Sequence, residues 1–131
     1  MAGIYTSYGR EQLAGIGLNS VAASVNHELI LYSNTYAPVV GTQLSDLTEV
    51  VAAGYARKTL TSGSWTVATV AGDTTISYAA QTFTLTAASD IGGYAIVDDT
   101  DEVIAAEQNV TANLRIDPDG DVVITPVITV G

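Results

Sequence analysis

Apolar and polar residues alternate strictly along residues 109–117 of the chain. The apolar positions are Val110, Ala112, Leu114 and Ile116, and the polar positions between and after them are Thr111, Asn113, Arg115 and Asp117. Successive side chains of a β-strand point to opposite faces of the sheet, so this spacing places all four apolar side chains on one face. The pattern predicts a half-buried strand.

Further segments follow the same logic less regularly: residues 27–34, 54–60, 64–70, 74–80, 81–87, 93–98 and 102–108. They are rich in Thr, Val and Ile, whose branched side chains suit a pleated sheet. Gly, Ser and Asp at residues 61–64, 71–73 and 89–93 predict tight turns. The pairs expected to face inward are Trp65 with Val67, Ile76 with Tyr78, and Phe83 with Leu85.

Turn signals recur about every 8 to 12 residues, which is typical of all-β domains rather than of alternating helices and strands. We therefore predict an all-β fold, an antiparallel β-sandwich or jelly-roll-like single domain spanning residues 27–131. Residues 1–26 are broken by glycines and predict an irregular N-terminal arm or cap. Residues 34–54 predict a long loop, with a turn of helix at 45–50 capped by Ser45.

The strongest hairpin signal lies at residues 115–125. Pro118 presets its own φ and Gly120 could adopt a left-handed conformation, so the flanking strands are expected to pair with each other. The residues after Pro126 still have strand composition, and the proline favours an edge position. Gly-Tyr-Ala occurs at 54–56 and again at 93–95 with different residues following, so we interpret each as a loop end followed by a half-buried tyrosine that begins a strand, not as a repeat.

Composition narrows the classes of function. The 131 residues carry 14 acidic and 4 basic side chains, for a net charge of −10, so nucleic acid should be repelled. Only 14% of residues are charged while 47% are hydrophobic, which indicates that part of the surface meets other protein. The chain has no Cys and no run of about 18 apolar residues, so we expect neither disulfides, nor a signal peptide, nor a membrane span.

The chain lacks a recognisable catalytic constellation. His27, the single histidine, lies beside Glu28 at the start of an apolar strand, where a structural role is the commoner one. No nucleophile elbow or phosphate-binding loop is present, so we expect no enzymatic activity. Two acidic clusters could offer oxygens to calcium, but their spacing differs from that of an EF-hand. We expect no metal and no cofactor, with calcium as the open alternative. The clusters are Asp98, Asp99, Asp101 and Glu102, and Asp117, Asp119 and Asp121.

Several parts of the chain carry a resemblance to a known class of proteins. They are residues 29–60, which contain "YSNTY" and "GYAR", Trp65, residues 83–98, which contain a late Gly-Tyr, and residues 103–108. The chain resembles small virion proteins of tailed bacteriophages. It departs from their pattern at "YSN", where Tyr-Thr-Asn is usual, and in its aspartate-rich last 23 residues. The resemblance implies a β-rich, non-catalytic component of the particle: a capsid decoration (cement) protein, a head fibre or a tail component.

From the resemblance and the composition together we expect a capsid decoration protein that binds the outer surface of the major capsid protein as a symmetric homo-oligomer, a trimer. It would be made in the bacterial cytoplasm and end on the virion, with no nucleic-acid or membrane partner. The anchors expected on the N-terminal arm are Ile4, Tyr5, Leu13 and Ile16. The alternative is a tail or head-fibre module that contacts the host, for example a sugar, through exposed tyrosines such as Tyr5, Tyr8, Tyr32 and Tyr36.

Overall fold

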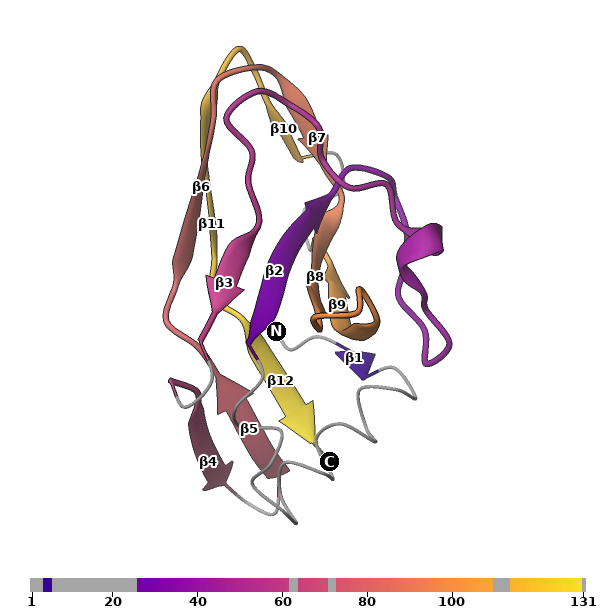
Figure 1. The fold of residues 1–131 in the computed structure, drawn as a ribbon, viewed down its shortest axis with the longest axis vertical. Coiled ribbons are helices and arrows are strands. Elements are labelled where there is room, and N and C mark those ends of the chain that lie inside the picture. The colour runs from indigo at the N-terminus through magenta and orange to yellow at the C-terminus, as the bar shows by residue number, and fades with distance from the viewer. Residues whose placement is uncertain (1–3, 6–25, 62–63, 71–72, 110–113, 131) are drawn as a thin grey trace.

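The computed structural model describes residues 4–5, 26–61, 64–70, 73–109 and 114–130, and these residues form an all-β, antiparallel, sandwich-like domain (Figure 1). The strands are β1 (Ile4–Tyr5), β2 (His27–Tyr32), β3 (Lys58–Leu60), β4 (Thr66–Val70), β5 (Asp73–Ser77), β6 (Gln81–Leu85), β7 (Ser89–Ile91), β8 (Gly93–Val97), β9 (Val103–Gln108), β10 (Leu114–Ile116), β11 (Gly120–Ile124) and β12 (Val127–Val130). One short 3-10 helix, η2 (Leu44–Asp46), lies between β2 and β3. The predicted fold class is thus confirmed.

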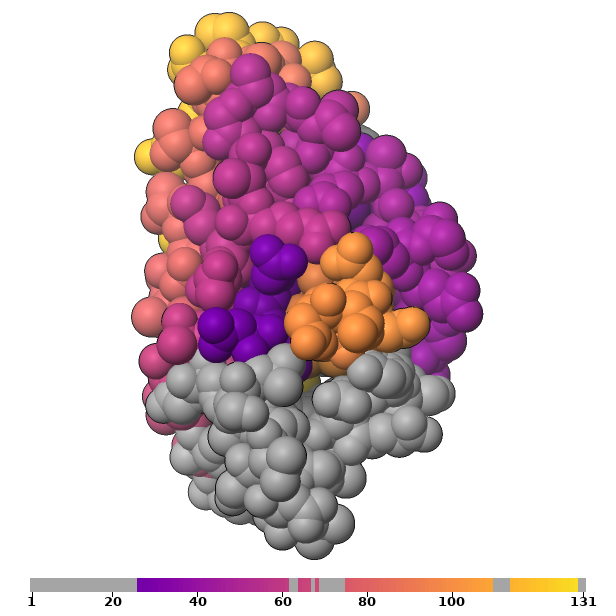
Figure 2. All heavy atoms as spheres, viewed as in Figure 1, coloured from indigo at the N-terminus to yellow at the C-terminus, as the bar shows by residue number. Residues whose placement is uncertain are grey.

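The largest sheet has the strand order β1-β9-β8-β2-β3, and its strands β2, β8 and most of β9 are buried on both faces. One face contributes to the main core, where Leu29 and Ile96 pack with Phe83, Leu85 and other apolar residues of the remaining strands. The opposite face carries a second core, which the segment at residues 33–50 covers through residues such as Leu47. Figure 2 shows the segment between β2 and β3 spread over the upper and right parts of the visible face.

The second half of the chain is one long hairpin. β5 pairs with β12, β6 with β11, β7 with β10 and β8 with β9, so the pairs are nested around the turn at residues 98–102. The same number of residues separates Leu85 from Ser89 on one side as separates Ile116 from Gly120 on the other. The two antiparallel segments therefore bend together and keep their register. Such nested pairing is expected of the ribbon in a jelly roll, but the jelly roll itself stays a prediction.

The hairpin predicted at residues 115–125 is wrong. The strands on either side of Pro118 do not pair with each other, because β10 pairs with β7 and β11 pairs with β6. Pro118 and Gly120 mark a bend in one side of the long hairpin, not a reversal of the chain. The turn predicted at residues 89–93 is also wrong, because Ser89–Ile91 is the strand β7, which pairs with β10 next to this bend.

Other boundaries shift by a few residues. The strand predicted at 54–60 begins only at Lys58, and the helical turn predicted at 45–50 is η2, which begins one residue earlier. Its start is held by Asp46, whose Oδ2 accepts a hydrogen bond of 2.9 Å from the backbone N–H of Gln43, so Ser45 is not the cap. Residues 127–130 form β12 at one end of a three-stranded sheet, as the edge prediction requires.

Phe83 and Leu85 face inward as predicted, each about 1% exposed. Trp65 and Tyr78 pack edge to face with ring centroids 5.2 Å apart, and both lie against the main core together with Ile76. The side chain of Val67, like residues 110–113 of the first predicted strand, lies outside what the structure describes. Of that strand, Leu114 and Ile116 are half-buried and Arg115 is exposed, which follows the predicted alternation.

Candidate functional site

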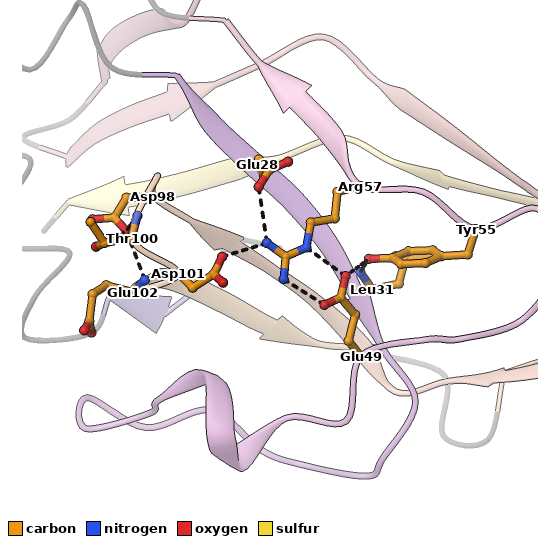
Figure 3. Close-up of polar contacts among 9 residues, drawn as sticks. All are labelled: Glu28, Leu31, Glu49, Tyr55, Arg57, Asp98, Thr100, Asp101 and Glu102. Carbon is orange, nitrogen blue, oxygen red and sulfur yellow. Dashed lines mark hydrogen bonds and ion pairs between the residues drawn. The ribbon is translucent and has the colours of Figure 1, made fainter.

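The densest polar cluster in the described part of the chain surrounds Arg57, the residue before β3 (Figure 3). Its guanidinium donates two parallel hydrogen bonds to Glu49, from Nε to Oε2 and from Nη2 to Oε1, each 2.9 Å long. Nη1 donates to Glu28 of β2 at 3.2 Å and to Asp101 at 2.7 Å. One cation thereby joins β2, the segment between β2 and β3, and the turn between β8 and β9.

Tyr55 extends this cluster toward the core. Its hydroxyl donates to Glu49 Oε2 at 2.7 Å and accepts a 3.3 Å hydrogen bond from the backbone N–H of Leu31. The ring stacks on Phe83, with centroids 5.9 Å apart. The second tyrosine of a Gly-Tyr-Ala triplet, Tyr94, lies within β8 and is only 5% exposed, so the predicted half-buried ring with its hydroxyl near water is wrong for Tyr94. Tyr55 is half-buried but begins no strand.

The electrostatics of the cluster are those of a structural ion network. Burial alone would raise the pKa of Glu49, but hydrogen bonds from Arg57 and Tyr55 outweigh burial and hold that pKa below its usual value. The hydrogen bonds to Glu49 and Asp101 raise the pKa of Arg57, so its charge is permanent. Burial, and then the hydrogen bond to Glu49, raise the pKa of the Tyr55 hydroxyl. A carboxylate held ionised by a bidentate arginine is a poor general base, because its lone pairs are already engaged.

The glycines of the two triplets are required by close approaches of the backbone. Gly54 has φ of +88°, and a Cβ there would lie 2.5 Å from the carbonyl oxygen of Thr84. A Cβ on Gly93 would collide with the carbonyl oxygen of Glu107 and the hydroxyl of Tyr32. Both glycines thus allow neighbouring elements to pack against the central strands.

The acidic turn at residues 98–102 is organised by its own hydrogen bonds. Asp98 Oδ1 accepts hydrogen bonds from the backbone N–H of Thr100 (2.9 Å), the hydroxyl of Thr100 (2.8 Å) and the backbone N–H of Glu102 (3.0 Å). Asp101 is engaged by Arg57. Within the described ranges no three His, Cys, Asp or Glu side chains are grouped so that they could share a metal ion. The calcium alternative therefore finds no support in this geometry.

The predicted contact residues are only partly placed. Ile4 and Tyr5 form β1, which pairs with Ala105 and Ala106 of β9, so this part of the predicted arm belongs to the large sheet. Leu13 and Ile16 lie outside the described residues. The proposal that these four residues bind a partner stays a prediction.

The tyrosine surface expected for host contact is not formed by the tyrosines that the structure describes. Tyr32 is fully buried, and its hydroxyl donates to the carbonyl oxygen of Tyr36 at 2.9 Å. The hydroxyl oxygen of Tyr36 lies 3.3 Å from Oγ1 of Thr42, and the two hydroxyls form a hydrogen bond. The side chain of Tyr5 and all of Tyr8 lie outside the description. His27 is likewise buried, at 4% exposure, in the first position of β2.

Exposed aliphatic residues are instead found on the segment between β2 and β3. Val51 is 94% exposed, Val39 56% and Val40 40%, while Val123 of β11 is exposed on another element. The sequence analysis missed both this set and Arg57. The signal for Arg57 was its rarity, because it is one of four basic residues and lies in an otherwise weakly charged stretch.

A separate pocket of about 390 Å³ lies between the β8–β9 pair, β10 and β11. Its lining includes the polar side chains of Tyr94, Glu107 and Asp121 and the apolar side chains of Ile91 and Leu114. No helix in the described residues is long and apolar enough to cross a membrane. No protein family matches the chain, and neither does any curated protein or solved structure.

Proposed function

We propose that the protein is a structural component of a tailed-bacteriophage particle, a capsid decoration protein that binds the outer surface of the major capsid protein as a symmetric trimer. The resemblance of residues 29–108 to small phage virion proteins supports this class. The all-β, antiparallel domain is of the kind that class implies. The net charge of −10 favours a location away from the nucleic acid inside the shell.

The observation that carries the proposal is the anchored segment between β2 and β3. It holds Val39, Val40 and Val51 in solvent, while Arg57 and Tyr55 tie its far end to the sheet. A surface whose backbone is already ordered loses little conformational entropy when a partner binds. Aliphatic side chains bury against protein without desolvating charge, so this segment suits assembly.

A non-catalytic role fits the chemistry of the described residues. The carboxylates of Glu49 and Asp101 are paired with one arginine, and Asp98 is occupied by its own turn. No nucleophile and base are brought together by the Arg57 cluster, which instead stabilises the segment that would dock.

The copy number in the particle tests the proposal. Quantitative mass spectrometry of purified virions of the phage that encodes the chain should find hundreds of copies of the protein. A few copies would instead favour a tail or head fibre, and absence from the particle would overturn both. Sedimentation of the purified protein should give the mass of three chains, and a monomer at all concentrations would refute the trimer.

Substitutions locate the contact. Particles prepared without the protein should bind the unmodified chain, and Val51→Ser should lower occupancy by about 10-fold if that side chain is buried on binding. Val123→Ser is the matched control, because Val123 is also exposed but lies on β11. Leu13→Ser with Ile16→Ser tests the predicted arm in the same assay. Equal occupancy for Val51→Ser and Val123→Ser would remove the segment from the interface.

A further inference from the structure

A short turn at residues 39–42 holds two valines in solvent. The backbone N–H of Val39 donates to Oγ1 of Thr42 at 2.8 Å, and the backbone N–H of Thr42 donates to the carbonyl oxygen of Val39 at 3.0 Å. Thr42 is only 4% exposed, whereas Val39 is 56% and Val40 40% exposed. Figure 1 shows the chain next to η2 as a loop that projects beyond the strands of the large sheet. The two aliphatic side chains therefore stand on an ordered, projecting support.

The pocket between the β8–β9 pair, β10 and β11 is a hollow of matching character. Its volume of about 390 Å³ is at the lower end of the range for binding sites. Leu114 and Ile116 of β10 and Ile124 of β11 line it and are only half-buried, so apolar surface is still accessible there. The side chains of Tyr94 and Glu107 are hydrogen-bonded to each other, so this polar part of the lining is paired within the chain. The pocket thus suits an uncharged, apolar occupant.

The turn and the pocket lie on opposite faces of the large sheet. Tyr36 and Leu44, on either side of the turn, pack against the second core. Tyr94 at the pocket belongs to the main core, and Leu114 and Ile116 pack against that core, on the other face. The turn therefore cannot enter the pocket of its own chain, whereas the turn of a second copy can.

We propose that the turn at residues 39–42 of one copy inserts into the pocket of the next copy and packs its two valines against the half-buried residues of β10. The charge of the occupant fits, because residues 36–43 carry none and bring none beside Glu107. The contact joins two different surfaces, and such a heterologous contact closes into a ring when the rotation between copies allows it. The inference deepens the proposed function, on which it rests for the number of copies, three.

Engineered cysteines test this contact. The chain has no Cys, so Val40→Cys with Thr125→Cys places the two thiols of each chain on the turn and at the pocket, which Thr125 lines. Because turn and pocket lie on opposite faces, a disulfide between them has to join two copies. We expect mild oxidation of the full chain to give a covalent species of three chains on a denaturing, non-reducing gel.

The matched control for the cross-link is Val40→Cys with Thr66→Cys. Thr66 is exposed on β4, outside the turn and the pocket, so this variant should stay largely monomeric on the gel. Cross-linking no stronger than in the control overturns the proposal. A ladder of more than three chains supports the contact and refutes the closed ring of three.

Sedimentation of single variants separates this contact from the trimer itself. Val39→Asp puts a charge into the apolar contact and should weaken the association of copies by about 10- to 100-fold. Thr66→Asp adds the same charge on β4 and should leave the association unchanged, so equal weakening by both variants refutes the contact. If the unmodified chain is a trimer that Val39→Asp leaves intact, the contact is wrong and the trimer stands. A monomer at all concentrations refutes both, while the copy number in virions still tests the role on the capsid.

Discussion

Replacing Arg57 with methionine tests whether the ion network holds the domain together. Methionine keeps much of the length and the apolar stem of the side chain but removes all the hydrogen bonds to Glu49, Glu28 and Asp101. Glu49 then keeps a single side-chain donor, Tyr55, although its side chain is only 27% exposed. A carboxylate that has lost its charged partner in a partly buried place is the main source of destabilisation.

The magnitude follows from the exposure of each partner. The bidentate pair with Glu49 is the least exposed, and a charged hydrogen-bonded pair of this kind contributes about 1.5 to 3 kcal/mol. Asp101 is 56% exposed and Glu28 39%, so solvent screening limits each of those pairs to about 0.5 kcal/mol. We expect Arg57→Met to lower the free energy of unfolding by about 2.5 to 4 kcal/mol and the melting temperature by about 10 °C.

Urea unfolding followed by the fluorescence of Trp65 measures this change, and Arg115→Met is the matched control. Arg115 is 51% exposed and pairs with Asp90, which is 61% exposed, so its loss should destabilise the domain much less than the loss of Arg57. The double variant Arg57→Met with Glu49→Gln should be more stable than Arg57→Met alone, because it removes the stranded charge. Equal effects of the two arginine substitutions, or additive effects in the double variant, would refute the reasoning.

Four further outcomes follow from the same contacts. Because the folded pKa of Glu49 lies below its unfolded value, its contribution to stability is complete above about pH 4.5 and should be lost as the pH falls through the folded pKa, as acid unfolding curves can show. The pKa of Glu107 is raised, so the unmodified protein loses stability relative to Glu107→Gln as the pH rises from about 4 to 7. If the melting temperature of Glu107→Gln falls relative to that of the unmodified protein over this range, the expectation is contradicted. Gly93→Ala should destabilise the domain by about 2 to 4 kcal/mol because the added methyl group meets backbone and ring atoms, whereas Gly41→Ala, with open space around it, should be nearly neutral in urea melts. Val51→Ser should leave the melting temperature within about 2 °C, since the side chain is 94% exposed; a larger drop would mean that Val51 packs within the fold.

The sequence predicted best those strands whose burial can be inferred from the residues of the strand itself. Gln81–Leu85 alternates along its length with Phe83 and Leu85 buried, and Gly93–Val97 is buried throughout. Period two reports the first pattern directly, while the second strand is indicated by its apolar, branched residues, which suit a sheet. Element ends differ by a few residues because hydrogen bonding to a partner strand, not composition, sets them.

The pairing of the strands could not be read in the same way. Pro118 and Gly120 are equally suited to a reversal and to a bend, and the choice depends on whether a partner strand is present across the sheet. Here the partners are β6 and β7, whose paired residues lie 23 to 43 positions away in sequence. A turn signal therefore locates a change of direction without saying which strands will meet.

The Arg57 cluster and the pocket were missed for a related reason. Arg57 meets Glu49, Glu28 and Asp101 across sequence separations of 8, 29 and 44 residues, and no local pattern joins these positions. In the pocket, Tyr94 and Asp121 come from opposite sides of the long hairpin. The pocket arises from the nested strand pairing, and the Arg57 cluster from the pairing of β2 with β3 and with β8, so only the tertiary structure brings their residues together.

The two-sided burial of the large sheet explains why the segment between β2 and β3 is held so firmly. β8 is buried along its whole length, so the outer face of the sheet needs an apolar cover, and Leu47 and its neighbours supply it. The backbone N–H of Val50 donates to the carbonyl oxygen of Leu31 at 2.9 Å, which fastens the cover to β2 beside the Arg57 cluster. Val51 directly follows this point and is almost fully exposed. The same contacts that shield the core therefore fix an aliphatic side chain in solvent, and stability and the proposed docking surface share one set of residues.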